Sequence, residues 1–160
     1  MYLIAAVDQN WAIGCQNKLL ARLSPDLKRF KALTLGHPVL LGRKTLETFP
    51  GGKPLPGRQN YILSTNPDYK VEKALVLHSL EEARTSCPAD TFVIGGAQVY
   101  RAALDWCDTA YITKIGAAWP EADVFFPNLD ENPAWFAAEE GEPLEHGGFS
   151  FRYVTYRRRG

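Results

Sequence analysis

Val39-Leu40-Leu41-Gly42-Arg43-Lys44-Thr45 indicates the fold class, because an apolar run of strand length passes directly into a polar helix start. Similar apolar runs recur at residues 3–7, 38–41, 60–63, 74–77, 91–94 and 110–115. Most are too continuous to be half-exposed, so we expect central strands covered on both faces. Helical stretches lie between several of them, at residues 25–35, 45–49, 80–86 and 98–104. This alternation predicts an α/β fold with a mostly parallel sheet and right-handed crossovers.

Two boundaries carry clear local signals. Ser24 is expected to cap the helix 25–35, with Pro25 at the first helical position and Gly36 beyond its end. Near the end of the chain, residues 149–156 alternate with the period of two that is typical of a strand. Residues 135–140 are a plausible partner, so an antiparallel pair is expected to complete the sheet.

Composition excludes several classes of protein. The chain has 160 residues, 46% of them hydrophobic and 22% charged, with a formal net charge of zero. We therefore expect one domain, residues 1–160, with no general attraction to nucleic acid or to membranes. The run Arg157-Arg158-Arg159 either contacts an acidic partner or is a solvated tail; its shortness favours the tail.

Cysteines and the first residues indicate the cellular compartment. Cys15, Cys87 and Cys107 form no C-x-x-C pair, which argues against a disulfide framework and against bound metal. The N-terminal apolar segment is short and has no basic residues before it, so we expect neither a signal peptide nor a membrane span. A cytoplasmic protein with reduced thiols is the expectation.

Small and polar residues follow three of the predicted strands. Gly42-Arg43-Lys44-Thr45, Ser64-Thr65 and Gly95-Gly96-Ala97-Gln98 each stand at a strand end. Ligands of open α/β sheets bind at the carboxyl ends of strands, and helix starts with cations nearby suit phosphates. Each segment alone has a simpler explanation: Gly95-Gly96 as a tight turn, Arg43 and Lys44 as a solvated helix start. Together they predict a dinucleotide site.

Asp26 is an unusual residue within the helix 25–35. At about 100° per residue, Asp26 shares one helix face with Leu27, Phe30 and Thr34, whereas Lys28, Arg29 and Ala32 lie on the other. The carboxylate either points to solvent in the first turn or faces the interior. An inward carboxyl group would have a raised pKa and would need a hydrogen-bonding partner, which the amidine-like edge of a ligand would supply.

Thr113 and Arg58 are two further polar candidates. Thr113 lies inside an apolar strand, where it is either an ordinary strand residue or a functional hydroxyl. Arg58 follows the turn-rich Lys53-Pro54-Leu55-Pro56-Gly57, where it is either a surface arginine or a bidentate ligand for a carboxylate.

Seven blocks of sequence, in this order and at matching spacing, resemble the bacterial dihydrofolate reductases: residues 3–8, 12–14, 25–31, 39–45, 54–58, 93–96 and 123–127. The resemblance covers nearly the whole chain. It implies a single-domain, mostly parallel eight-stranded sheet with a C-terminal antiparallel strand, flanked by four helices. It also implies hydride transfer from NADPH to dihydrofolate, giving tetrahydrofolate, with antifolates as further ligands and a monomeric protein.

The same resemblance implies a role for individual residues on the substrate side. Asp26 would bind the amidine edge of the pterin and assist protonation of its N5, within a hydrogen-bond network that includes Thr113. Arg58 would hold the α-carboxylate of the glutamate tail, with Lys31 nearby. The walls around the pterin and benzoyl rings would be formed by Ile4, Ala5, Leu27, Phe30, Phe49, Leu55, Ile94 and Tyr100.

On the cofactor side, the resemblance makes Arg43 and Thr65 the readers of the 2′-phosphate, and Gly95-Gly96 a frequent site of a cis peptide. The nicotinamide and the loop over it would be bordered by Ala6, Ile13, Gly14, Asn17, Lys18 and Leu19. The rest of NADPH would be bound by Gly42, Arg43, Lys44, Thr45, Leu63, Ser64, Thr65, Gly95, Gly96, Ala97, Gln98, Val99 and Tyr100.

The sequence departs from the family pattern at two positions. Many relatives have Leu-Pro-Trp where this chain has Leu19-Leu20-Ala21, and some have an arginine where Gln98 stands. The first change puts the details of proton delivery in question. Two rival functions are a reductase of the same fold acting on another heterocycle, such as the pyrimidine of riboflavin synthesis, and a non-catalytic nucleotide-binding module. Neither would need both Asp26 and Arg58.

Overall fold

The computed structural model describes residues 1–15, 18–19 and 23–160. Its strands are β1 (Tyr2–Val7), β2 (Ala12–Cys15), β3 (Lys18–Leu19), β4 (Val39–Gly42), β5 (Asn60–Leu63), β6 (Ala74–Leu77), β7 (Phe92–Gly95), β8 (Thr109–Ile115), β9 (Val124–Phe125), β10 (Trp135–Glu140), β11 (Leu144–His146) and β12 (Phe149–Arg158). Its helices are α1 (Ser24–Thr34), α2 (Arg43–Glu47), α3 (Leu80–Ser86) and α4 (Ala97–Ala103), with a short 3₁₀ turn at Pro50–Gly52.

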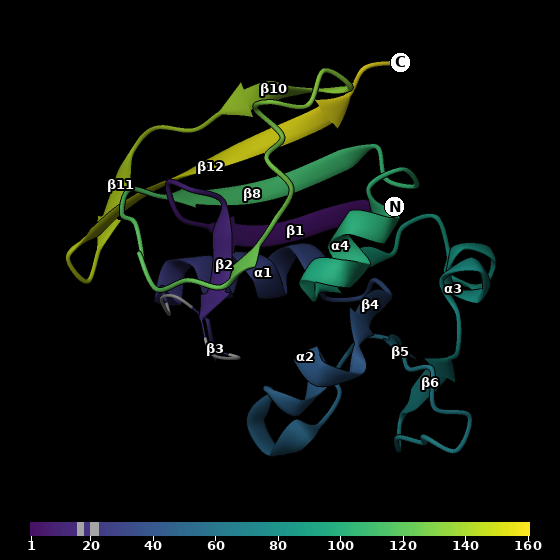
Figure 1. Ribbon diagram of the computed structural model, residues 1–160. Helices are drawn as coiled ribbons and strands as arrows, with labels where there is room; N and C mark the ends of the chain where they lie inside the picture. Colours follow the sequence, from purple (N-terminus) through teal and green to yellow (C-terminus); the bar gives the residue numbers. More distant parts are fainter. Residues whose placement is uncertain (16–17, 20–22) are drawn as a thin grey trace.

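The main sheet has the strand order β10-β12-β8-β1-β7-β4-β5-β6, with β11 paired to β12 (Figure 1). The strands from β8 to β6 pair in parallel, and β12 is antiparallel to both β8 and β10. The predicted eight-stranded, mostly parallel sheet with antiparallel pairing at the C-terminus is therefore confirmed. The four predicted helices are also present among the described residues.

A second, smaller sheet was not expected from the sequence. It has the order β3-β2-β9 and lies beside the main sheet (Figure 1). Asp8 holds its entry loop: the buried carboxylate accepts hydrogen bonds from the backbone N–H groups of Asn10, Ala12 and Trp119, at 2.8, 2.9 and 2.9 Å. These bonds compensate for the burial of the charge and join the segment before β9 to the end of β1.

Two helix boundaries differ from the prediction. Leu23, not Ser24, is the N-cap of α1; it makes no side-chain capping bond, and Ser24 is already helical with Pro25 behind it. Helix α2 begins at Arg43, directly at the end of β4, and ends at Glu47. The predicted range, 45–49, therefore lay two residues too far toward the C-terminus. The polar strand end thus forms the first turn of the helix, which places Arg43, Lys44 and Thr45 beside the strand ends.

The basic run near the C-terminus is not a simple tail. Arg158 lies within β12, donates hydrogen bonds to the carbonyl oxygens of Cys107 (3.0 Å) and Leu104, and lies over the Trp135 ring. Its partners are backbone groups and an aromatic ring of the same fold. The solvated-tail interpretation was therefore wrong for Arg158, because the strand extends two residues beyond the predicted end.

Two of the three cysteines have side chains that the structure describes. Cys87 and Cys107 are free and buried, and burial raises their pKa values to about 11 and about 12, which makes them unreactive at neutral pH. Among the described helices, none has the length and apolar character needed to cross a membrane.

Candidate active site

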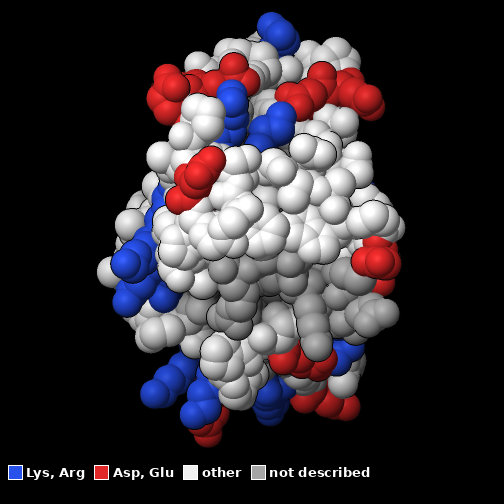
Figure 2. Space-filling view, turned by 90° about the vertical axis from the view of Figure 1, so that its left-hand side faces the viewer, with Lys and Arg blue, Asp and Glu red and all other residues white. Residues whose placement is uncertain are grey.

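Two adjoining clefts lie at the carboxyl ends of the central strands. The first has a volume of about 1220 Å³ and the second of about 790 Å³, and both have Ala5, Ala6, Ile94 and Tyr100 in their walls. On the face drawn in Figure 2, charged side chains of both signs lie near its upper and lower ends and along its sides. The clefts therefore form one continuous depression at the edge where the sequence predicted ligand binding.

Asp26 reaches the first cleft from α1, and Thr113 meets it from β8. The Thr113 hydroxyl donates a hydrogen bond of 2.5 Å to Asp26 Oδ1. Burial raises the pKa of the Asp26 carboxyl above its ordinary value, while the hydrogen bond from Thr113 and the charge of Arg29 act in the opposite direction. Of the two orientations left open by the sequence, the inward one is correct.

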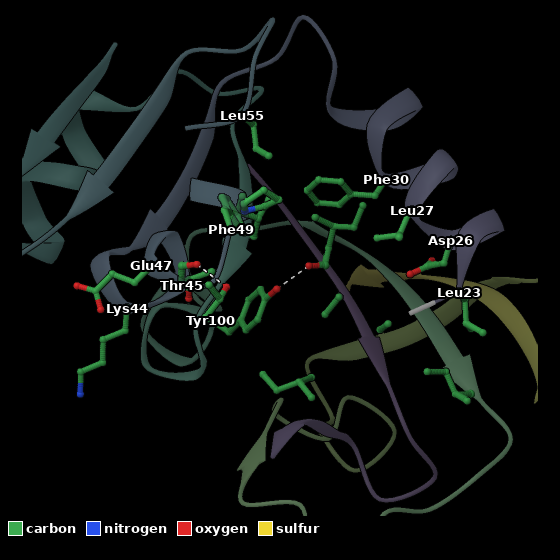
Figure 3. Close-up of a pocket in the computed structure, with 18 of the residues that line it drawn as sticks. Leu23, Asp26, Leu27, Phe30, Lys44, Thr45, Glu47, Phe49, Leu55 and Tyr100 are labelled. Atoms are coloured by element: carbon green, nitrogen blue, oxygen red, sulfur yellow. Dashed lines mark hydrogen bonds between the residues drawn. The ribbon is translucent and has the colours of Figure 1, made fainter. Parts of the chain in front are cut away.

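The walls of the first cleft are largely apolar. In Figure 3, Leu27 and Phe30 project from α1 beside Asp26 and face Phe49 and Leu55 across the opening. Tyr100 is buried, and its hydroxyl donates a 2.7 Å hydrogen bond to the carbonyl oxygen of Ile4. All the wall residues expected from the sequence line this cleft: Ile4, Ala5, Leu27, Phe30, Phe49, Leu55, Ile94 and Tyr100.

Arg58 and Lys31 are not part of the described lining of either cleft. Arg58 Nη1 donates to Thr34 Oγ1 (3.0 Å) and Nε donates to the carbonyl oxygen of Pro56 (2.9 Å). These two bonds fix the guanidinium at the end of α1, one helical turn or more from Phe30. Lys31 lies on the exposed part of the same helix. Both residues thus stand beyond the cleft, near its α1 side.

The second cleft is built from the strand ends that the sequence singled out. Its walls include Gly42, Arg43, Lys44 and Thr45 after β4, Leu63, Ser64 and Thr65 after β5, and the segment from Gly95 to Tyr100 after β7. The bond between Gly95 and Gly96 is a cis peptide, as expected. Arg43 is not free in this structure: its Nη1 donates to Glu47 Oε1 at 2.7 Å, within α2.

The nicotinamide-side candidates are only partly described. Ala6, Ile13 and Gly14 line the second cleft. Asn17 lies outside the described residues, as does Ala21, where many relatives have an indole. For Lys18 and Leu19 only the backbone, in β3, is described.

Several cleft residues were missed by the sequence analysis. Leu23, Glu47, Thr48, Pro50 and Ile115 line the first cleft. Asn66, Tyr69 and Val124 line the second. Two of these residues could have been found from the sequence. Leu23 directly precedes the helix that carries Asp26, and Ile115 follows Thr113 by two residues, which places both on the same face of the strand. Val124 carries no local signal, since only the pairing of β9 with β2 brings it there.

Among the described residues, no group of three or more His, Cys, Asp or Glu could hold a metal ion.

Comparisons with known proteins agree with this geometry. The family model described as dihydrofolate reductase matches residues 1–158. The chain is 36% identical to dihydrofolate reductase of Bacillus subtilis (strain 168), covering 98% of this chain and 93% of that protein. It is 43% identical to dihydrofolate reductase type 3 of Salmonella typhimurium over 79% of this chain and 77% of that protein.

A solved structure is similar over almost the whole length. Dihydrofolate reductase from Enterococcus faecalis, complexed with NADP(H) and RAB-propyl, superposes with a TM-score of 0.87 at 36% identity, covering 99% of this chain and 96% of that one. Sequence and structure thus agree on the same family over nearly every residue. The chain belongs to the dihydrofolate reductase family.

Proposed function

We propose that this chain catalyses the NADPH-dependent reduction of 7,8-dihydrofolate to 5,6,7,8-tetrahydrofolate. One observation carries the proposal: the Asp26 carboxyl group lies in an apolar cleft, hydrogen-bonded to Thr113, beside a second cleft built from three strand ends. A flat heterocycle with an amidine edge fits the first cleft, and a phosphorylated dinucleotide fits the second. Membership of the dihydrofolate reductase family supports the same assignment.

The second cleft suits NADPH in shape and in chemistry. A Cβ atom added to Gly95 would lie 3.0 Å from Thr45 Cγ2, and one added to Gly96 would lie 3.1 Å from Thr45 Oγ1. The glycines therefore keep the backbone open to a ligand where any side chain would crowd Thr45. Arg43 and Lys44 supply positive charge for phosphates, and Ser64 and Thr65 supply hydroxyls.

The chemistry requires a hydride at C6 of the pterin and a proton at N5. NADPH, when bound, supplies the hydride. The apolar walls exclude bulk water around the ring, and Tyr100 is held in place by its bond to Ile4. The protein side of the reaction is therefore mainly orientation of the ring and control of one proton.

Asp26 is the group that controls that proton. One of its oxygens accepts from Thr113, which leaves the other for the amidine edge of the pterin. The negative charge of a carboxylate at that edge stabilises the protonated pterin ring and therefore raises the basicity of N5. The proton itself reaches N5 through water. Arg58, which stands beyond the cleft near the end of α1, holds the α-carboxylate of the glutamate tail and acts on binding.

A spectrophotometric assay tests the proposal. The purified chain is expected to consume NADPH absorbance only when dihydrofolate is added. A reductase for another heterocycle would consume NADPH only with that other substrate. A nucleotide-binding module would bind NADPH and consume none. Either result would contradict the proposed function.

The molecular context is also part of the proposal. We expect one domain spanning residues 1–160, acting as a monomer in the cytoplasm on small molecules, with antifolates as competing ligands. The zero formal charge and the mixed charges on the face in Figure 2 support a protein without a nucleic-acid partner. Light scattering of the purified protein tests the monomer directly.

A further inference from the structure

Behind Asp26, on the side away from the cleft, the structure places one cation in an aromatic cluster. Arg29 follows Asp26 by three residues on α1, so the two side chains are neighbours on the helix surface. The guanidinium of Arg29 lies 4.0 Å from the centroid of the Tyr153 ring and 5.9 Å from that of Tyr111. Arg29 is half-buried, although the sequence placed it on the outer face with Lys28.

The register of the sheet connects this cluster to the hydrogen bond of Asp26. Tyr153 on β12 is the cross-strand partner of Thr113 on β8, and Tyr111 is two residues before Thr113. Cross-strand partners and residues two apart project from the same face of a sheet. Thr113, Tyr111 and Tyr153 therefore share the face on which α1 packs, and Arg29 lies between that helix and this face.

Arg29 does not form an ion pair with Asp26, although the spacing on α1 would permit one. The ion pairs between described residues are His37–Asp90, Arg43–Glu47 and Lys114–Asp130. The aromatic ring of Tyr153 holds the cation in a cation–π contact instead. The second carboxylate oxygen thus remains available to a ligand, while the positive charge stays near enough to act through space.

We infer that Arg29 is a positioning residue for the reduction: held over Tyr153, its guanidinium determines the pH range in which Asp26 and the bound pterin take up a proton. This inference rests on the proposed function for its kinetic part. Burial raises the pKa of Asp26, and the hydrogen bond from Thr113 and the charge of Arg29 act against it. Burial also raises the pKa of Tyr153, where the charge of Asp26 adds to the rise and that of Arg29 opposes it. The three groups are therefore electrostatically linked.

Other charged groups on the neighbouring strands face away. Lys114 follows Thr113 on β8 and pairs with Asp130 on the opposite face of the sheet. There its ammonium group also donates to the Tyr156 hydroxyl and lies over the Trp11 ring. Arg152 is the cross-strand partner of Lys114 and is exposed on that same opposite face. Among the described residues of α1, β8 and β12, Arg29 is thus the charged side chain placed to act on Asp26.

The sign of the effect does not depend on which group carries the proton. A positive charge close to the site disfavours a proton on Asp26 and on N5 alike, so its removal raises the proton affinity of both. Arg29→Gln is therefore expected to shift the pH profile of hydride transfer to higher pH. Above the wild-type midpoint the variant is then the faster enzyme, an outcome that general damage to the fold does not produce.

Two measurements test the inference, one of them without substrate or cofactor. The first is the titration of the Asp26 carboxyl carbon by NMR in the ligand-free protein. The second is the pH dependence of single-turnover hydride transfer. Arg29→Gln is expected to move both midpoints upward. Arg29→Lys keeps the charge and is expected to return the midpoints close to those of the wild type.

Lys28→Gln is the matched control, because it removes the same charge one residue away on the exposed side of α1. It is expected to leave both midpoints in place. Tyr153→Phe keeps the ring and is expected to leave the Asp26 titration in place as well. Equal shifts in Lys28→Gln and Arg29→Gln, or no shift of the Asp26 titration in Arg29→Gln, would overturn the inference. Absence of dihydrofolate reduction in the wild type would contradict only the proposed function, since the NMR titration needs no turnover.

Discussion

The hydroxyl of Thr113 donates a hydrogen bond of 2.5 Å to the Asp26 carboxylate, although 87 residues of sequence separate them. The packing of α1 on the sheet explains this contact, because side chains of α1 meet β8 and β12 on one face. A carboxyl group in an apolar cleft needs such a partner to compensate for lost hydration. The contact thus serves both the fold and the proposed reaction.

Replacement of Asp26 is expected to weaken catalysis in a pH-dependent way. Asp26→Asn should lower turnover by about 10²–10⁴-fold, the usual range for assistance by a positioned acid or base. The loss should become smaller at low pH, where solvent protonates N5 without help. Turnover measured from acid to neutral pH checks this. A loss of the same size at every pH would mean that Asp26 only binds the substrate or only supports the fold.

The same replacement should stabilise the ligand-free protein. Burial raises the folded-state pKa of Asp26 above its unfolded value, so the folded state binds the proton more tightly. The stability of the wild type therefore falls as pH rises from the unfolded toward the folded pKa, and the penalty persists above it. Asp26→Asn removes this penalty: the variant should gain stability at neutral pH, and the gain should disappear in acid. Urea unfolding at several pH values measures it.

Asp130 provides a control of opposite sign. Burial would raise its pKa, but hydrogen bonds from Lys114 and Tyr156 and the charge of Lys114 lower it overall. Its contribution to stability is present above the unfolded pKa and is lost as pH falls through the folded pKa. Asp130→Asn should therefore lose stability at neutral pH. Parallel behaviour of the two variants would show that the amide substitution itself, and not the titration, decides the result.

Regular elements were predictable where local physics determines them. The run 60–63 became β5 and the run 80–86 became α3 with the expected bounds, because continuous apolar residues and a capping serine dominate locally. The small sheet escaped prediction, since β2, β3 and β9 are only two to four residues long and depend on contacts far apart in sequence. Residues with one tertiary role, such as Val124, escaped for the same reason.

The candidate site was predictable in part from the residues and in larger part from the resemblance. Helical geometry correctly grouped Asp26 with Phe30, but it could not decide whether this face points inward. It placed Arg29 outside, because the pattern of a single helix does not show that Tyr153 covers that side. The sequence analysis did not foresee the ion pair of Arg43 with Glu47, because that contact depends on where α2 begins.

Arg43 is expected to read the 2′-phosphate that distinguishes NADPH from NADH. A charge-assisted hydrogen bond is worth about 1.5–3 kcal/mol. Arg43→Ala should therefore weaken NADPH binding by about ten- to a hundred-fold and leave the poor reaction with NADH nearly unchanged. Equilibrium binding of both nucleotides measures the difference. Glu47→Gln serves as the matched variant, because it releases Arg43 from its 2.7 Å ion pair and should not weaken NADPH. Equal loss of both nucleotides in Arg43→Ala would make Arg43 a structural residue.

Arg58 should act on substrate binding and not on the hydride step. Its guanidinium is already oriented by bonds to Thr34 and to the carbonyl oxygen of Pro56. Arg58→Lys keeps the charge but cannot reproduce the planar fork. The KM for dihydrofolate should rise while kcat changes little, and a pteridine substrate without the glutamate should be indifferent to the change. If both substrates suffer alike, Arg58 contacts something other than the carboxylate.

Gly95 should tolerate no side chain, for reasons that the surrounding structure makes specific. Its φ of +150° disfavours any L-residue, and an added Cβ would lie 3.0 Å from Thr45 Cγ2 and 3.2 Å from Thr45 Oγ1. Gly148 is the control: its φ of +83° is also positive, but an added Cβ would meet nothing within 4 Å. Gly148→Ala should cost about 1–2 kcal/mol of stability, the usual cost of that backbone conformation, and leave NADPH binding unchanged. Gly95→Ala should cost about 1–3 kcal/mol more through overpacking and should also weaken NADPH binding.

Thr45→Ser removes the Cγ2 atom and should recover part of the lost stability in the Gly95→Ala background. Equal unfolding midpoints for the two alanine variants, with full NADPH affinity in both, would show that Thr45 does not pack closely against Gly95.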